Sequence, residues 1–348
     1  MRRRAFIQAL LAAALFGAAT PFSKSLLAGL QPNQLAGLLY LGAAICLFPL
    51  VLRRRLAGRA VLPRDARNRR NLLGAIVFGG VIGPVLLLAG LKHALAASVS
   101  MWLNLESAAT AVIAVLLFRE HLGKWTWCGN FGVLAAGILL GFNEGWSGWI
   151  GLAFVGGAAA AWGLDNNFTA VIDGISAEDS TFWKGLVAGG TNLAIGLTFF
   201  PWQFGTDWLW ALLLGSLAYG ASIVLYIRAA HGLGAARSQM VFAAAPFFGV
   251  LLSIAWLDEG MSALQVLAAL ALAGSIALMF RDRHDHEHRH EALCHEHEHA
   301  HDDRHHGHAH DDGPADSAHT HLHEHEAEAH SHPHWPDVHH RHHGDNGR

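Results

Sequence analysis

Ten apolar runs, each of about 18 to 24 residues, constrain this chain more than any other feature of its sequence. An α-helix rises about 1.5 Å per residue, so about 20 apolar residues cross the hydrocarbon core of a bilayer. The 348 residues are 52% hydrophobic and only 15% charged, which is too apolar for an ordinary soluble domain. We therefore predict an all-α integral membrane protein with ten transmembrane helices, at approximately residues 5–26, 33–52, 72–91, 95–118, 126–143, 149–172, 184–201, 208–229, 237–257 and 262–280.

One of these runs occurs twice. The segment from Ala96 to Leu122 returns 139 residues later as Ala235 to Met261, and both copies begin with an Ala-Ala pair and reach a glutamate. Duplicated helical halves are common in secondary transporters. Because each half has five helices, an odd number, the second half enters the membrane from the opposite side. We predict two inverted five-helix repeats, at residues 1–145 and 146–280, followed by a tail at 281–348.

Basic residues indicate the orientation of the helices. With the N-terminus in the cytoplasm, the run from Arg53 to Arg70 and Lys184 fall inside, and only Lys24 and Lys92 of the membrane body fall outside. The basic run directly follows a membrane helix, which favours contact with anionic lipid over nucleic acid. We predict a multi-pass protein of the cytoplasmic (inner) membrane with both termini in the cytoplasm.

The pair Arg3-Arg4 before an apolar run is similar to a twin-arginine signal. Cleavage after such a signal would remove one helix from the first repeat and disturb the distribution of basic residues. We therefore expect an uncleaved first helix with a basic cytoplasmic flank.

Polar residues at helical spacing mark a candidate substrate pathway. A charged carboxylate at the bilayer centre costs on the order of 2.5 to 3.5 kcal/mol, so an intramembrane acid is a functional hypothesis by default. Glu106 is either a proton-coupling or cation-binding group or a hydrogen-bonded structural glutamate. The predicted pathway residues are Ser98, Trp102, Glu106 and Thr110 in the fourth run, Trp162, Asp165, Asn166 and Thr169 in the sixth, Thr20 and Lys24 in the first, and Tyr219 and Tyr226 in the eighth.

Some of these residues have structural alternatives. Lys24 faces the same cavity or extends to the outer interface, and aromatic residues such as Tyr219 also pack in cores at this spacing. Glu120 and Glu259 end their apolar runs just before the next helix, where a carboxylate accepts hydrogen bonds from free N–H groups. We predict that both act as structural helix-start caps.

The repeated pattern is an apolar helix, then a glutamate, then a glycine-rich helix, with Leu105-Glu106 in one half and Ala245-Pro246 in the other. It resembles the EamA-type family of the drug/metabolite transporter superfamily, over residues from about 5 to 280. The resemblance implies a ten-helix inverted-repeat permease of the cytoplasmic membrane that moves small organic metabolites, often outward. Family members commonly carry proline after the Leu-Glu pair, whereas Ser107 follows Glu106 here.

The tail from Arg281 onward holds 23 of the 26 His together with 16 Asp and Glu, and it lacks apolar periodicity. We expect it to be disordered and cytoplasmic. Imidazole, carboxylate and thiol groups together suit Zn, Ni, Co or Cu, with binding that weakens below about pH 6.5; a solvated extension is the alternative. The candidate metal ligands are His284, His286, His288, His290, Cys294, His295, His297 and His299.

Two functions fit these features. The first is a secondary transporter, an exporter of a small organic metabolite such as an amino acid, which requires no cofactor and carries the tail as regulator or bystander. The alternative is a divalent metal exporter, or another metal-handling membrane protein, whose tail captures the metal. A weaker third interpretation makes the membrane body an anchor for a metal-buffering tail.

The membrane interior favours the organic substrate. A dedicated metal path normally needs two or more convergent ligands at the midplane, and Glu106 and Asp165 have no buried His near them in the predicted helices. An enzyme is not expected, because the sequence has no phosphate-binding loop with lysine, no paired carboxylates in a soluble segment and no nucleophile beside a buried base.

Overall fold

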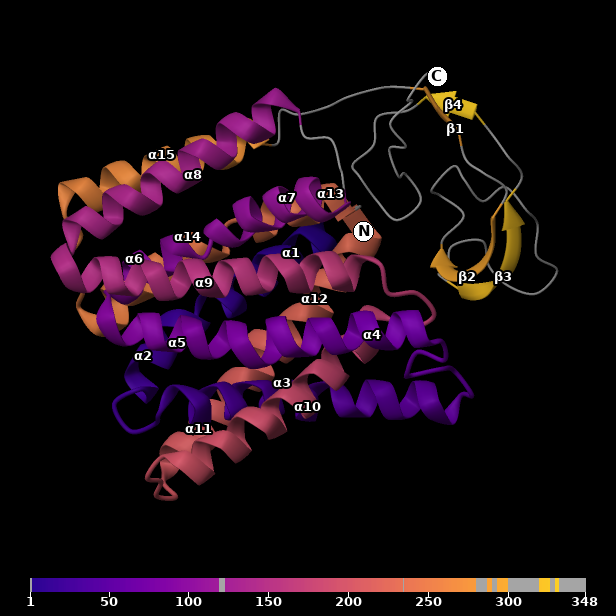
Figure 1. Ribbon diagram of the computed structural model, residues 1–348, viewed down its shortest axis with the longest axis horizontal. Coiled ribbons are helices and arrows are strands. Elements are labelled where there is room, and N and C mark those ends of the chain that lie inside the picture. The colour runs from indigo at the N-terminus through magenta and orange to yellow at the C-terminus, as the bar shows by residue number, and fades with distance from the viewer. Residues whose placement is uncertain are drawn as a thin grey trace.

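The computed structural model describes residues 2–118, 123–233 and 235–279, and four strand segments of the tail. The described body is helical, and its helices run side by side in one bundle (Figure 1). The first half contains α1 Arg2–Gly17, α2 Ala19–Leu26, α3 Pro32–Leu56, α4 Ala66–Ala75, η1 Ile76–Ile82, α5 Gly83–His93, α6 Ala96–Trp102, α7 Leu105–Phe118 and α8 Lys124–Asn143. The second half contains α9 Gly145–Ala170, α10 Ala177–Phe199, α11 Thr206–Gly215, η2 Ser216–Ala221, α12 Ser222–Leu233, α13 Ala235–Phe242, α14 Ala245–Leu257 and α15 Ala263–Met279.

Each of the ten predicted runs corresponds to a helix or to consecutive helical segments. Eight stretches in the described part of the chain are long and apolar enough to cross a membrane, and α15 is a shorter apolar helix. The helix at the seventh predicted run is α10, which begins at Ala177, earlier than the start predicted near residue 184. A capping box specifies this start: the Ser176 hydroxyl accepts a hydrogen bond from Asp179 N at 3.2 Å. The apolar pattern places the start too late because the first turn of α10 is acidic.

Three membrane crossings are interrupted by short turns, at Ala18, at Leu103–Asn104 and at Ala243–Ala244. The turn before Glu106 forms without a proline, since Ser107 follows Glu106. The Ser107 hydroxyl donates to Asn104 O at 2.8 Å, and Asn104 Nδ2 donates to Met101 O at 3.1 Å. The same two carbonyls also accept backbone hydrogen bonds, from Asn104 N and Ser107 N, so the side chains reinforce a turn that the backbone already closes.

Two other crossings contain a π-helical segment, η1 after α4 and η2 after α11. Their spacing along the chain is close to the 139 residues that separate the duplicated sequence segments. The turns at Leu103–Asn104 and Ala243–Ala244 have a similar spacing. The same irregularities therefore occur at matching positions in both halves, and π-helical segments of this kind are frequent at functional sites.

Small residues allow the helices to approach closely. A Cβ on Gly37 of α3 would meet Leu193 N of α10 at 2.6 Å, and one on Gly185 of α10 would meet Tyr40 O at 2.7 Å. Close backbone approach matters in lipid, where the hydrophobic effect does not drive helices together. Figure 1 shows α8 and α15 packed together on one side of the bundle, and α3, α10 and α11 on the opposite side.

The described residues of the tail form two short antiparallel sheets. β1 pairs with β4, with Glu287 opposite Ser331, and β2 pairs with β3, with His299 opposite His319. An alternating two-residue sequence pattern is compatible with an extended backbone. The strands are β1 Glu287–Arg289, β2 Leu293–His299, β3 His319–His325 and β4 Ala329–Ser331.

Candidate functional site

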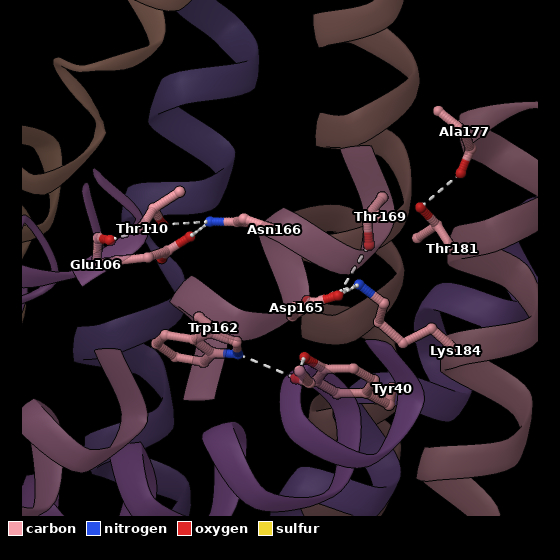
Figure 2. A network of polar contacts seen from close by, with 11 residues as sticks. Tyr40, Glu106, Thr110, Trp162, Asp165, Asn166, Thr169, Ala177, Thr181 and Lys184 are labelled. Carbon is pink, nitrogen blue, oxygen red and sulfur yellow. Dashed lines mark hydrogen bonds and ion pairs between the residues drawn. The ribbon is translucent and has the colours of Figure 1, made fainter. Parts of the chain in front are cut away.

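The Glu106 carboxylate lies at the start of α7, directly after the turn that interrupts the fourth crossing. Asn166 Nδ2 of α9 donates to Glu106 Oε1 at 2.8 Å and to Thr110 Oγ1 at 3.1 Å. The Thr110 hydroxyl donates to Glu106 O at 2.8 Å. We call these three residues the Glu106 group (Figure 2). Glu106 is half-buried and Asn166 is exposed, so the hydrogen bond between α7 and α9 joins a partly covered carboxylate to an amide at the surface of the described helices.

Asp165, the residue before Asn166 in α9, forms an ion pair with Lys184 of α10. Lys184 Nζ lies 2.6 Å from Asp165 Oδ1 and 2.7 Å from Oδ2, and the Thr169 hydroxyl donates to Oδ1 at 3.0 Å. Adjacent residues point about 100° apart on a helix. Consequently α9 presents an amide toward α7 and a paired carboxylate toward α10, as Figure 2 shows.

Backbone carbonyls of η1 bind side chains from three other helices in the same region. Gly79 O accepts hydrogen bonds from the Tyr40 hydroxyl at 2.7 Å and from Trp162 Nε1 at 3.0 Å. Gly80 O accepts one from Asn192 Nδ2 at 3.0 Å. Tyr40, Trp162 and Asn192 belong to α3, α9 and α10, so the π-helical segment connects the helices that surround the Asp165 pair.

Aromatic rings connect the two halves of the chain. The Tyr219 ring in η2 lies 5.8 Å from that of Tyr40 and 5.7 Å from that of Phe16, measured between centroids. Phe16 of α1 is 5.4 Å from Phe242, which is 5.1 Å from Tyr226. The predicted pathway residues Tyr219 and Tyr226 therefore lie in one row of rings that includes first-half residues.

The first part of the predicted stripe, Ser98 and Trp102, lies apart from the Glu106 group. The stripe assumed one continuous helix, but the turn at Leu103–Asn104 separates α6 from α7 and changes the direction of the side chains. Ser98 is fully buried, and its hydroxyl accepts a hydrogen bond from Gln265 Nε2 at 3.1 Å. Trp102 is 1% exposed and lies in the main hydrophobic core.

Lys24 lies at the junction of α5 and α6, not beside Glu106. Its Nζ donates to Leu91 O at 2.5 Å and to Ala94 O at 2.9 Å. A cation at the C-terminal end of α5 complements the free carbonyls there. Thr20, one turn before Lys24, is buried within α2.

Two carboxylates bind the other side of this junction. Glu259 Oε1 and Oε2 accept hydrogen bonds from Ala96 N at 2.8 Å and Ala97 N at 2.9 Å, and Glu144 Oε2 accepts one from Leu95 N at 2.8 Å. The amides that Glu259 binds belong to α6 and not to α15, the helix that follows it. A second-half carboxylate thus binds a helix start in the first half. Burial raises the pKa of the Glu144 carboxyl, which lies between two membrane spans.

Several predicted residues cannot be placed as side chains. Glu120, His284, His286 and His290 lie outside the described residues. The remaining metal-ligand candidates belong to strand segments: His288 to β1, and Cys294, His295, His297 and His299 to β2. Within the described part of the chain, no group of three or more His, Cys, Asp or Glu side chains is arranged to hold a metal ion.

Sequence reasoning missed three residues of this region. Lys184 looks like a cytoplasmic flank because the apolar run begins there, yet it lies two turns inside α10. The capping-box pattern from Ser176 to Asp179 is the signal that places it within the helix. Tyr40 and Asn192 give no such signal, because their role depends on carbonyls of a distant π-helical segment.

Comparisons with known proteins agree with this architecture. The sequence profile of the EamA-like transporter family matches residues 3–142 and 149–281, one match in each half. A protein of Methanothermobacter thermautotrophicus described as an uncharacterized transporter is 24% identical over 306 residues, covering 79% of this chain and 85% of the relative. A solved crystal structure, described only as that of a protein, is similar in fold, with a TM-score of 0.58 and 19% identity over 79% of this chain and 94% of that chain.

Proposed function

Because the chain belongs to the EamA-like transporter family of the drug/metabolite transporter superfamily, and is therefore a membrane transporter, we propose that it exports a small organic metabolite such as an amino acid. The observation that carries the proposal is the Glu106 group, a half-buried carboxylate beside a break in a membrane-spanning helix. The Asp165–Lys184 pair adds an anion and a cation to the same helix bundle. A zwitterionic substrate requires groups of both signs.

Coupling to an ion gradient is assigned to Glu106 in this proposal. Binding of a proton or cation changes the charge on the carboxylate that Asn166 contacts across α7 and α9. A ligand shifts a conformational equilibrium only when it binds the two states differently, and a carboxylate at a helix break is suited to that role. The irregular segments at matching positions of both halves support alternating access between two repeats.

The proposed orientation follows from the number of crossings and from the basic residues. Five helical passes in each half, each a single helix or a run of consecutive helical segments, support inverted repeats at residues 1–145 and 146–280. The basic segment from Arg53 to Arg70 supports a cytoplasmic location for both termini of this cytoplasmic-membrane protein. The tail is then a cytoplasmic extension that binds Zn, Ni, Co or Cu.

The decisive experiment measures flux into and out of proteoliposomes for a panel of amino acids, nucleosides, polyamines and divalent metals. Glu106→Gln keeps the side-chain shape but removes the titratable charge, so it should abolish gradient-driven flux while the protein still inserts normally. Glu178→Gln is the matched control. Glu178 Oε2 lies 3.2 Å from a guanidinium nitrogen of Arg54, and Glu178 does not belong to the Glu106 group. Unchanged coupled flux in Glu106→Gln would remove Glu106 from the mechanism.

A divalent metal exporter is the second candidate, and the 23 His of the tail are the observation that favours it. The described helices offer no cluster of metal ligands to continue a path through the membrane. Flux of Zn or Ni without flux of any organic compound in the same panel would decide for this candidate.

A further inference from the structure

A largely apolar cavity of about 380 Å³ lies between α7, α8 and α9. Its size is within the range of small-molecule sites, roughly 300 to 1,000 Å³. Twelve of its lining residues are apolar or glycine, and Asn130 of α8 is the polar member. The apolar members are Leu105, Ala108, Ala109, Val112, Trp127, Phe131, Leu134, Gly137, Ile138, Leu152, Gly156 and Ala159.

Asn130 is the unusual feature of this cavity. The residue is 2% exposed, and neither its Nδ2 nor its Oδ1 has a hydrogen-bond partner among the described residues. A buried amide without a partner is unfavourable, because it gives up water on both its donor and its acceptor side. Inside a membrane span no bulk water is at hand to compensate. The cavity therefore offers one unsatisfied donor–acceptor pair on an apolar wall.

The cavity is separate from the Glu106 group. Leu105, Ala108, Ala109 and Val112 follow each other at helical spacing and form one stripe of α7. Glu106 is one residue, about 100°, away from Leu105, and it faces Asn166 instead. A ligand in the cavity would thus contact α7 without contacting the carboxylate.

The rim of the cavity faces the surface that lipid covers. Phe131 and Ile138 of α8 line it and are 65% and 48% exposed, within a helix long and apolar enough to span the membrane. Among the described residues, no charged side chain lines the cavity. A ligand that enters from the bilayer is consequently apolar, and the group it presents to Asn130 is uncharged.

We propose that this cavity binds a long-chain amphiphile whose single polar group is a neutral carboxylic acid or carboxamide. Such a group carries a donor and an acceptor side by side. Its carbonyl accepts from Asn130 Nδ2 while its O–H or N–H donates to Asn130 Oδ1, so one ligand group satisfies both unpaired atoms. An ester carbonyl satisfies only the donor, and an alkane satisfies neither.

The test uses the full-length protein in detergent and four probes with the same chain: palmitic acid, palmitamide, methyl palmitate and hexadecane. Native mass spectrometry counts bound probe, and thermal unfolding measures stabilisation. We expect palmitamide to bind about tenfold more tightly than methyl palmitate, as the loss of one hydrogen bond implies. Palmitic acid should bind more tightly as the pH is lowered, whereas palmitamide binding should not depend on pH. Equal affinity for all four probes would overturn the proposal and leave only apolar partition.

Two variants locate the site. Asn130→Leu should lose the preference for palmitamide over methyl palmitate and, because the amide has no partner, should unfold at an equal or higher temperature without ligand. Gly156→Leu should block the cavity with Asn130 intact, since a Cβ at Gly156 has open space around it. Gly190→Leu is the matched control, because Gly190 of α10 also has open space and lies outside the cavity.

Other results with these variants would contradict the proposed site. Palmitamide binding that survives Gly156→Leu would place the ligand elsewhere and refute the proposal. A dimer that Gly156→Leu converts to monomer would assign the surface to a second copy of the chain instead. Should Asn130→Leu fail to fold, the Gly156→Leu and Gly190→Leu pair still decides the question.

Discussion

At the scale of single residues, the Asp165–Lys184 ion pair is the most constrained contact of the candidate site. The Asp165 side chain is 9% exposed and that of Lys184 16%, and both carboxylate oxygens lie within 2.7 Å of the ammonium. Desolvation of two charges offsets much of their attraction, so such a pair adds little net stability. Removal of one partner, however, leaves the other charge buried and unpaired.

We therefore expect Asp165→Asn and Lys184→Met each to reduce the free energy of unfolding by about 3 to 5 kcal/mol. The double variant should be more stable than either single variant, because no charge is left unpaired. Urea unfolding in detergent, followed by circular dichroism, gives the three values. Additive losses would show that the two side chains do not depend on each other.

At the scale of elements, the π-helical segment η1 holds α9 at a defined distance. A Cβ on Gly79 would come against the Asp165 carboxylate, and one on Gly83, where α5 begins, would meet Trp162 Nε1 at 2.6 Å. Glycine at these positions lets α9 lie directly on the segment whose Gly79 carbonyl binds Tyr40. The backbone geometry of η1 and the position of Asp165 are thus coupled.

Gly79→Ala should displace Asp165 from Lys184 and destabilise the protein by roughly 1 to 3 kcal/mol, as overpacking of a tight contact does. Gly190→Ala provides the comparison, because a Cβ there meets nothing within 4 Å. Thermal unfolding of the two variants, together with their flux in proteoliposomes, separates the local clash from the general effect of replacing a helical glycine. Equal behaviour of the two variants would contradict the close contact at Gly79.

The apolar pattern of the sequence predicts the positions of the helices better than their boundaries. Apolar run length locates a helix or consecutive helical segments at all ten predicted positions, but it misses the start of α10, where acidic residues precede the apolar face. It also leaves the turn before Glu106 unpredicted, because Asn104 and Ser107 stabilise that turn through hydrogen bonds that no hydropathy pattern contains. Interruption of the helix then places Ser98 and Trp102 away from Glu106.

At the scale of the whole molecule, the two halves bind each other at the junction of α5 and α6. Glu259 of the second half contacts the start of α6, and Lys24 of α2 contacts the end of α5. A rearrangement of one half against the other must change the Glu259 contacts, so the junction links the positions of the two repeats. The tail follows the second match to the EamA-like family, which ends at residue 281.

Deletion of residues 281–348 should accordingly remove metal binding and leave the flux of organic substrate unchanged. Isothermal titration with Zn or Ni in the full-length and deleted proteins measures the first effect, and proteoliposome flux measures the second. Because imidazole must be neutral to bind a metal, affinity of the full-length protein should fall as the pH drops through about 6.5. Loss of organic flux on deletion would give the tail a part in transport.

Apolar run length and repeat spacing are local properties that each segment carries alone, so the membrane class, the ten helical passes and the duplication could be predicted from the amino-acid sequence. It also singled out Glu106, Asp165 and Asn166, since polar groups inside apolar runs are unfavourable unless they are partnered or functional. Only the tertiary structure decided which partners they have. The Asp165–Lys184 contact joins two different helices, α9 and α10, and the Glu259 contact joins the second half of the chain to α6 in the first half. Both contacts depend on how the helices pack, which no local sequence pattern contains.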